Sequence, residues 1–141
     1  MRILGDSLYK DFQEVLTGKD TNAKLILPKF GLSKLYERSI RGFVYSVDPK
    51  QQLNCPVNNS KDSLGLQQPF LCFQMNLCGE HLQINVEVIV KDSLKRKRRI
   101  IFSTSFQKIM ANELHCQIPF RIEYPQNWHT LIFDIGTVTS G

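Results

Sequence analysis

Apolar and polar residues alternate most regularly between Leu82 and Val90. Every second position is apolar, including Ile84, Val86 and Val88, and most positions between them are polar. A β-strand places successive side chains on opposite faces, so a period of two suits a strand that buries one face and exposes the other. We therefore predict a strand over residues 82–90, with Ile84, Val86 and Val88 on its buried face.

A strongly basic segment follows this strand and leads into apolar residues over 100–102. A polar segment between two runs of strand character is typical of a β-hairpin. The pattern predicts a hairpin with a cationic tip and a return strand over residues 100–104. The consecutive cationic residues of the segment are Lys95, Arg96, Lys97, Arg98 and Arg99.

Other segments of the chain also have strand character, because they alternate in polarity or are rich in β-branched and aromatic residues. Residues 6–16 instead place apolar side chains at roughly helical spacing, and residues 106–113 are expected to form a loop with a short helical turn. The predicted strands cover residues 23–27, 42–47, 70–77, 115–120 and 128–135, with one more short strand near Cys55.

Many short strands with little helix predict an all-β fold, in the form of an antiparallel β-sandwich. The length of 141 residues and the hydrophobic content of 42% are sufficient for one domain with one core. No internal repeat or low-complexity segment interrupts the pattern. A single compact domain is therefore expected.

The charge of the chain favours an acidic partner. The formal net charge is +5 and the isoelectric point is about 9.1. Nucleic acid, an anionic membrane and an acidic protein surface all fit this charge. Residues 1–6 lack the apolar segment of a signal peptide, and no stretch of about 18 apolar residues occurs, so we expect neither classical secretion nor a membrane span.

No group of residues has the spacing of a catalytic site. The three histidines lie outside any Ser/His/Asp or Cys/His pattern, and the eight glycines are dispersed rather than gathered in a phosphate-binding loop. The four cysteines form no Cys-x-x-Cys pair and are predicted to be reduced, buried thiols of a cytosolic protein. We predict a protein that is not an enzyme and binds no cofactor. The alternative is a zinc site with the ligands Cys78, His81, His115 and Cys116.

Several segments, taken in order, resemble the domain of cilia- and flagella-associated protein 20. They comprise an early strand, a Leu-Gly-Leu step into an apolar strand, a strand that ends in an arginine-containing basic hairpin, and a proline-bearing strand before a tryptophan strand. The resemblance covers roughly residues 40–136, about two-thirds of the chain. The segments are Gly42–Val47, Leu64–Leu71, Val86–Arg99, Ile118–Phe120 and Trp128–Asp134.

The resemblance implies a jelly-roll-like antiparallel β-sandwich without catalytic activity. It implies a microtubule-associated structural or docking module of cilia, flagella or centrioles, with tubulin and other ciliary or centriolar proteins as partners. The expected location is the cytoskeleton, in the axoneme of a cilium or in a centriole.

The resemblance also bears on domain organisation. Residues 1–41 are interpreted as an N-terminal extension with a first strand, and residues 42–141 as the β-sandwich domain. The chain is similar to the divergent N-terminal domains of longer relatives. Because the family's domain continues into further strands, we expect a fragment or a shortened isoform with one unpaired sheet edge.

The candidate partner-binding residues are those of the basic run, Lys95, Arg96, Lys97, Arg98 and Arg99, and an acidic tubulin surface would suit them. Consecutive strand residues alternate between faces, so all five cannot meet one partner. Their side chains are expected to be exposed and to add little to the core. A solvated tip that protects the sheet edge is an equally weighted interpretation.

Two alternatives use other features. The basic run could bind nucleic acid or act as a nuclear localisation signal, although no ladder of exposed aromatic residues accompanies it. Trp128, the only tryptophan, is expected to anchor the core. In a carbohydrate-binding sandwich it would instead stack on a sugar from an exposed face.

Overall fold

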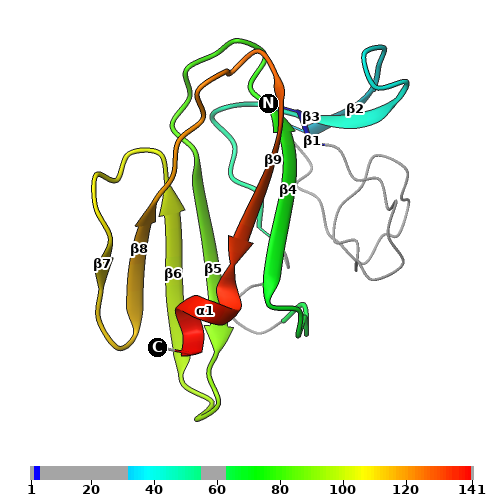
Figure 1. Cartoon of the computed structure of the whole chain (residues 1–141). Helices are drawn as coiled ribbons and strands as arrows, with labels where there is room; N and C mark the ends of the chain where they lie inside the picture. The colour runs from blue at the N-terminus through cyan, green and yellow to red at the C-terminus, as the bar shows by residue number, and fades with distance from the viewer. Residues whose placement is uncertain (1, 4–31, 55–62, 141) are drawn as a thin grey trace.

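The computed structural model describes residues 2–3, 32–54 and 63–140, and Figure 1 shows their arrangement. Within these residues the chain forms nine strands and one short helix. The elements are β1 (Arg2–Ile3), β2 (Leu32–Glu37), β3 (Gly42–Val47), β4 (Phe70–Asn76), β5 (Asn85–Lys91), β6 (Lys97–Ser103), β7 (Met110–Ala111), β8 (His115–Pro119), β9 (Trp128–Asp134) and α1 (Ile135–Ser140).

The strands form two sheets. The first has the order β2-β3-β1-β4-β9, and all of its neighbouring strands are antiparallel. The second has the order β5-β6-β8-β7, in which β6 and β8 are parallel and the other pairs are antiparallel. The prediction of an all-β sandwich is confirmed. The parallel pair was not expected, and it arises because residues 104–114 cross back along the sheet through β7 before β8 begins.

Aromatic and aliphatic side chains from both sheets meet in the core. Phe133 of β9 stacks on Phe102 of β6 with ring centroids 4.1 Å apart, and Ile100 and Ile135 are buried beside them. Phe73 and Phe120 contact the same ring edge-on. Aromatic rings from segments far apart in the sequence therefore contact one another between the two sheets.

The alternation that predicted β5 is confirmed. Val86 and Val88 pack against the core cluster of Ile100 and Phe102, and Ile84 is buried. On β4 the same alternation buries Met75 and exposes Cys72. Only the boundaries differ: β5 begins at Asn85 rather than Leu82, and β6 begins at Lys97 rather than Ile100. β6 is longer because Lys97 pairs with Lys91 across the hairpin.

The helix α1 was not predicted. Asp134 caps it, because its carboxylate accepts hydrogen bonds from the main-chain N–H of Thr137 at 2.9 Å and from the Thr137 hydroxyl. The N–H groups of Ile135 and Gly136 donate to the carbonyl of Pro69 at 2.8 and 3.0 Å. The hydrogen bonds from the hydroxyl and the main-chain N–H of Thr137 lower the pKa of the Asp134 carboxyl. The first turn of the helix is thus fixed to the segment that leads into β4.

Other local expectations have mixed outcomes. The short helical turn expected within residues 106–113 is wrong, because this segment contains the strand β7. The strands over 42–47, 70–77, 115–120 and 128–135 are confirmed within a residue or two. The helix over 6–16, the strand over 23–27 and the strand near Cys55 lie outside the described residues. The strand β2, which pairs along the whole of β3, was not predicted.

Trp128 does not anchor the core. Along β9, Leu131 and Phe133 point inward, and Thr130 and Ile132 are exposed. Trp128 shares the outward register of Thr130 and Ile132 and is half-buried. The predicted core role is therefore wrong, since this ring belongs to the outer face of the sheet.

Candidate functional site

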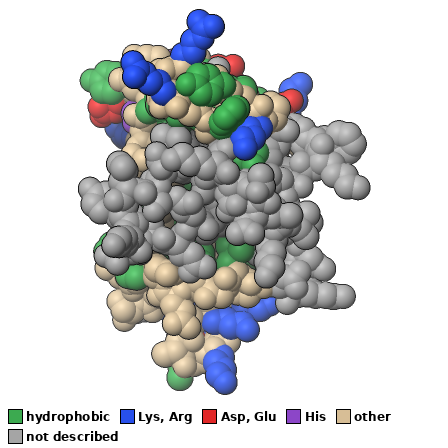
Figure 2. Space-filling model, turned by 90° about the vertical axis from the view of Figure 1, so that its right-hand side faces the viewer, with side chains coloured by type: hydrophobic (Ala, Val, Ile, Leu, Met, Phe, Trp, Pro, Cys, Tyr) green, Lys and Arg blue, Asp and Glu red, His purple; other side chains and the backbone are tan. Residues whose placement is uncertain are grey.

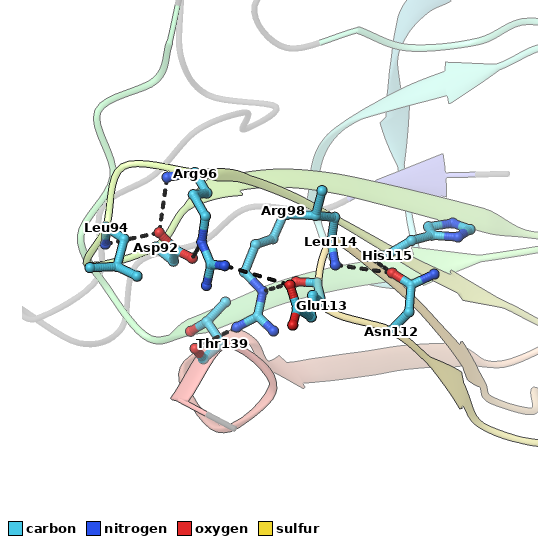
Figure 3. Close-up of polar contacts among 9 residues, drawn as sticks. All are labelled: Asp92, Leu94, Arg96, Arg98, Asn112, Glu113, Leu114, His115 and Thr139. Atoms are coloured by element: carbon cyan, nitrogen blue, oxygen red, sulfur yellow. Dashed lines mark hydrogen bonds and ion pairs between the residues drawn. The ribbon is translucent and has the colours of Figure 1, made fainter.

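The basic run forms the turn and the first half of the return strand of the β5–β6 hairpin. The carboxylate of Asp92 organises the turn, because it accepts hydrogen bonds from the main-chain N–H groups of Leu94 and Arg96, both at 2.9 Å (Figure 3). The N–H of Lys95 donates to the main-chain carbonyl of Asp92 at 2.9 Å. A rigid turn therefore holds the tip of the hairpin.

Asp92 also neutralises part of the basic run. The Arg96 Nε lies 2.9 Å from Asp92 Oδ2, and only 6% of the Asp92 side chain is exposed. Burial of this carboxyl raises the pKa of Asp92, but the hydrogen bonds and charge of Arg96 outweigh it, so that the pKa lies below its ordinary value. Asp92 is consequently ionised at neutral pH. The guanidinium of Arg96 also approaches Glu113 Oε2 at 3.8 Å.

Arg98 lies in the inward register of β6 and is half-buried. Its Nε donates to the carbonyl of Glu113 at 2.9 Å, and its Nη1 donates to the carbonyl of Thr139 at 2.8 Å (Figure 3). The side chain therefore joins the hairpin to the β7–β8 turn and to the last turn of α1. The expectation that the whole basic run is exposed is wrong at Arg98, whose charge lies within the fold.

Arg99 points to the outer face of the sheet and is paired there. Its Nε and Nη2 donate to the two carboxylate oxygens of Glu87 on the neighbouring strand, each at 2.8 Å. The side-chain hydrogen bond to Glu87 raises the pKa of Arg99. This bidentate pair cancels the charge of Arg99 on the sheet surface.

Three lysines of the hairpin remain available to a partner. Lys91, Lys95 and Lys97 are exposed, and within the described residues their ammonium groups make no hydrogen bond or ion pair. Lys91 and Lys97 lie opposite each other on the outer face, where two like charges repel across the strands. In the view of Figure 2, basic side chains are visible at both ends of the molecule, including the lower end that carries the hairpin in Figure 1.

Aliphatic side chains accompany these cations. Leu94 is 71% exposed at the tip, and Ile89 is 52% exposed on the outer face beside Arg99. The aromatic residues nearest in sequence are Phe102, which is buried, and Phe106, which is half-buried. Within the described part of the hairpin, the surface therefore combines lysine with aliphatic side chains and offers no aromatic ring for base stacking.

The conformation of Lys95 leads to a prediction about stability. Its φ angle is +60°, in the left-handed region that costs a residue with a Cβ about 1–2 kcal/mol. We expect Lys95→Gly to raise the free energy of unfolding by about 0.5–1 kcal/mol, because glycine adopts this region without strain but loses more backbone entropy on folding.

Urea denaturation measures this effect. The control is Lys97→Gly, which lies within β6 and should lower the free energy of unfolding. Equal losses of stability in the two variants would contradict the assigned turn.

The proposed zinc ligands lie at two different ends of the sheet. Cys78 and His81 precede β5, whereas His115 pairs with Arg99 near the hairpin end, next to Cys116. Among the described residues, no group of three or more His, Cys, Asp or Glu side chains is placed to hold a metal. The described cysteines Cys72, Cys78 and Cys116 are free. The expectation of buried thiols is wrong for Cys72 and Cys78, which are exposed.

The architecture is that of an all-β sandwich with a basic hairpin at one end and a short helix joined to that hairpin through Arg98. The chain belongs to the CFA20 domain family, since the family model of the CFA20 domain matches residues 23–141. This match confirms the resemblance and includes residues 23–41, which precede the segments that suggested it. No curated protein shows a significant match to the chain. Membership in this family indicates a cilia-associated role.

Within the described residues, no helix has both the length and the apolar character needed to cross a membrane.

Proposed function

We propose that this protein is a non-catalytic, microtubule-associated docking module of cilia, flagella or centrioles. Its partners are the tubulin lattice and other ciliary or centriolar proteins, and its location is the cytoskeleton of the cilium or centriole. The observation that carries this proposal is the hairpin surface, on which Lys91, Lys95 and Lys97 are exposed without an intramolecular partner. Family membership supports the ciliary setting.

Within the part of the chain that the structure describes, the arginines of the hairpin are paired, whereas its lysines are not, and this difference supports the proposal. Arg96, Arg98 and Arg99 make hydrogen bonds to acidic or carbonyl oxygens of the chain itself. The lysines are left to contribute a positive field at one end of the sandwich, which attracts an acidic protein surface and speeds its encounter. Leu94 and Ile89 add apolar contact area between the charges. Such a mixture suits a protein surface better than a phosphate backbone.

The hairpin end of the sandwich offers a partner a surface rather than a cavity. The cavity between Arg98, His115 and Val138 has a volume of about 10 Å³. This is room for about one water molecule and not for a substrate. The hairpin end of the sandwich is therefore suited to surface contact.

The test is co-sedimentation with polymerised microtubules in competition with duplex DNA. We expect binding to microtubules to persist in the presence of duplex DNA at an equal concentration of charge, and to weaken gradually as salt screens the exposed lysines. A nucleic-acid-binding protein would prefer the DNA, and its affinity for DNA would fall steeply with salt as counterions are released. Preference for DNA would replace the proposal by a nuclear or nucleic-acid-binding function.

A further inference from the structure

An open pocket lies at the end of the sandwich opposite to the hairpin. Its volume is about 460 Å³. The residues that line it are Leu77, residues 80–83, Thr104, residues 121–123 and Pro125. The N–H of Gly79 donates to the carbonyl of Pro125 at 3.0 Å, so the two lining segments are joined. The volume of the pocket is in the size range of protein binding sites.

The pocket combines an apolar wall with a charged rim. The half-buried Leu82 and Ile122 contribute the wall, behind which Leu77 is buried. The carboxylates of Glu80 and Glu123 lie on the exposed rim. Within the described residues, neither carboxylate makes a hydrogen bond or an ion pair. Arg121 also lies on the rim, so the rim carries two negative charges and one positive charge. An apolar side chain with a cation beside it fits this arrangement.

The hairpin tip presents that pair of side chains. Leu94 is 71% exposed, and the neighbouring Lys95 is exposed and held by the turn that Asp92 organises. β5 runs from the pocket to the hairpin, and its seven residues span about 23 Å, so the two features lie at opposite ends of the sandwich (Figure 1). The hairpin of one molecule therefore cannot reach the pocket of the same molecule.

We propose that the hairpin tip of one copy of this chain binds in the pocket of a second copy. Leu94 packs against Leu82 and Ile122, and Lys95 forms ion pairs with Glu80 and Glu123. The contact is heterologous, because it joins two different surfaces, so repeated association produces a head-to-tail row rather than a closed dimer. This self-association occupies only Leu94 and Lys95 at the tip and leaves Lys91 and Lys97, which pair on the outer face, available to a microtubule. It goes beyond docking to microtubules and does not depend on it.

The contact is weak in solution. A single hairpin tip buries less surface than the roughly 1,200 Å² of a stable interface, which places it among transient contacts. Copies held side by side on a lattice would have a high effective concentration for one another, and the same contact would then be well populated. The row is accordingly expected to form more readily on a support than free in solution.

The test uses two variants, each with substitutions in one of the two contacting surfaces. The tip variant carries Leu94→Ser and Lys95→Gln, which remove the apolar side chain and the charge without creating a new charge. The pocket variant carries Glu80→Lys and Glu123→Lys. Sedimentation velocity is measured from about 10 µM to about 1 mM, the range of a weak contact. The wild-type sedimentation coefficient should rise steadily with concentration, and each variant alone should remain monomeric. An equimolar mixture of the two variants should form dimers and nothing larger, because one intact tip and one intact pocket remain.

Several results would overturn the proposal. These are a monomeric wild type over the whole range, continued association of either variant alone, or a monomeric mixture of the two. The milder pocket variant Glu80→Gln and Glu123→Gln should weaken association without adding charge, which excludes a loss caused by misfolding. The pocket variants keep all three hairpin lysines, so their microtubule binding should not be weakened. A failure of self-association is thereby distinguished from a failure of docking.

Discussion

Replacing Phe133 with alanine is expected to lower the free energy of unfolding by about 3–5 kcal/mol. The ring of Phe133 is 6% exposed and lies at the centre of the core. It stacks on Phe102 at 4.1 Å and contacts Phe73 and Phe120 edge-on. Its removal would leave a cavity between the two sheets that these neighbours cannot fill without leaving their own positions. Domains of this size are stable by about 5–15 kcal/mol, so the variant should be close to unfolding.

The adjacent residue provides a matched control. Ile132 lies on the same strand, points to the opposite face and is 65% exposed. Ile132→Ala should change the free energy of unfolding by no more than about 0.5 kcal/mol. Thermal or urea denaturation compares the two variants directly. Similar losses at both positions would mean that the register of β9, and with it the packing of the two sheets, is misassigned.

The strands that could be predicted from the sequence are those with a clear period of two. In β5, Val86 and Val88 alternate with Glu87, and this local pattern is enough to assign the buried face. The position of β8 beside β6 could not be predicted, because pairing between strands depends on contacts between distant segments. The parallel pairing of Arg99 with His115 has no local sequence pattern.

The helix α1 could not be predicted from a local sequence pattern. Gly136, Thr137 and Val138 are poor helix formers, and a helix of six residues is too short to be stable alone. The helix exists because of its surroundings, namely the Asp134 cap, the Pro69 carbonyl and the hydrogen bond from Arg98 to Thr139. The Asp134 cap is local, but the contacts with Pro69 and Arg98 join distant segments that no single window of sequence contains.

The candidate site was likewise predictable only in part. A run of five basic residues is evident in the sequence, and their alternation between strand faces follows from elementary geometry. Which charges are cancelled depends on Asp92, Glu87 and Glu113, whose positions relative to the arginines are set by the hairpin and by β7 and β8. Lys91 was not included in the predicted site, although the hairpin register would have placed it opposite Lys97.

Reversing two lysines of the hairpin is expected to weaken microtubule binding by on the order of tenfold, the equivalent of about 1.4 kcal/mol. The variant is Lys91→Glu with Lys97→Glu. These residues lie opposite each other, so the change replaces one pair of like charges with another, and the fold should be nearly unaffected. Arg98 is unsuitable for this test, because its hydrogen bonds hold the β7–β8 turn and α1, and its loss would disturb the fold itself.

The control variant changes the net charge by the same amount at another site. Arg38 and Lys50 are exposed in turns on either side of β3, away from the hairpin. Arg38→Glu with Lys50→Glu should leave microtubule binding within about twofold of the wild type, because the contribution of an isolated exposed charge is small and screened. Thermal melts of both variants should match the wild type within a few degrees.

Co-sedimentation of these two variants with microtubules, side by side with the wild type at physiological ionic strength, tests the docking function most directly. The proposed function predicts that the Lys91 and Lys97 variant loses most of its binding while the Arg38 and Lys50 variant keeps it. Full binding by the hairpin variant would contradict a docking role for the hairpin. Loss of binding only in the Arg38 and Lys50 variant would place the microtubule contact on the turns that flank β3.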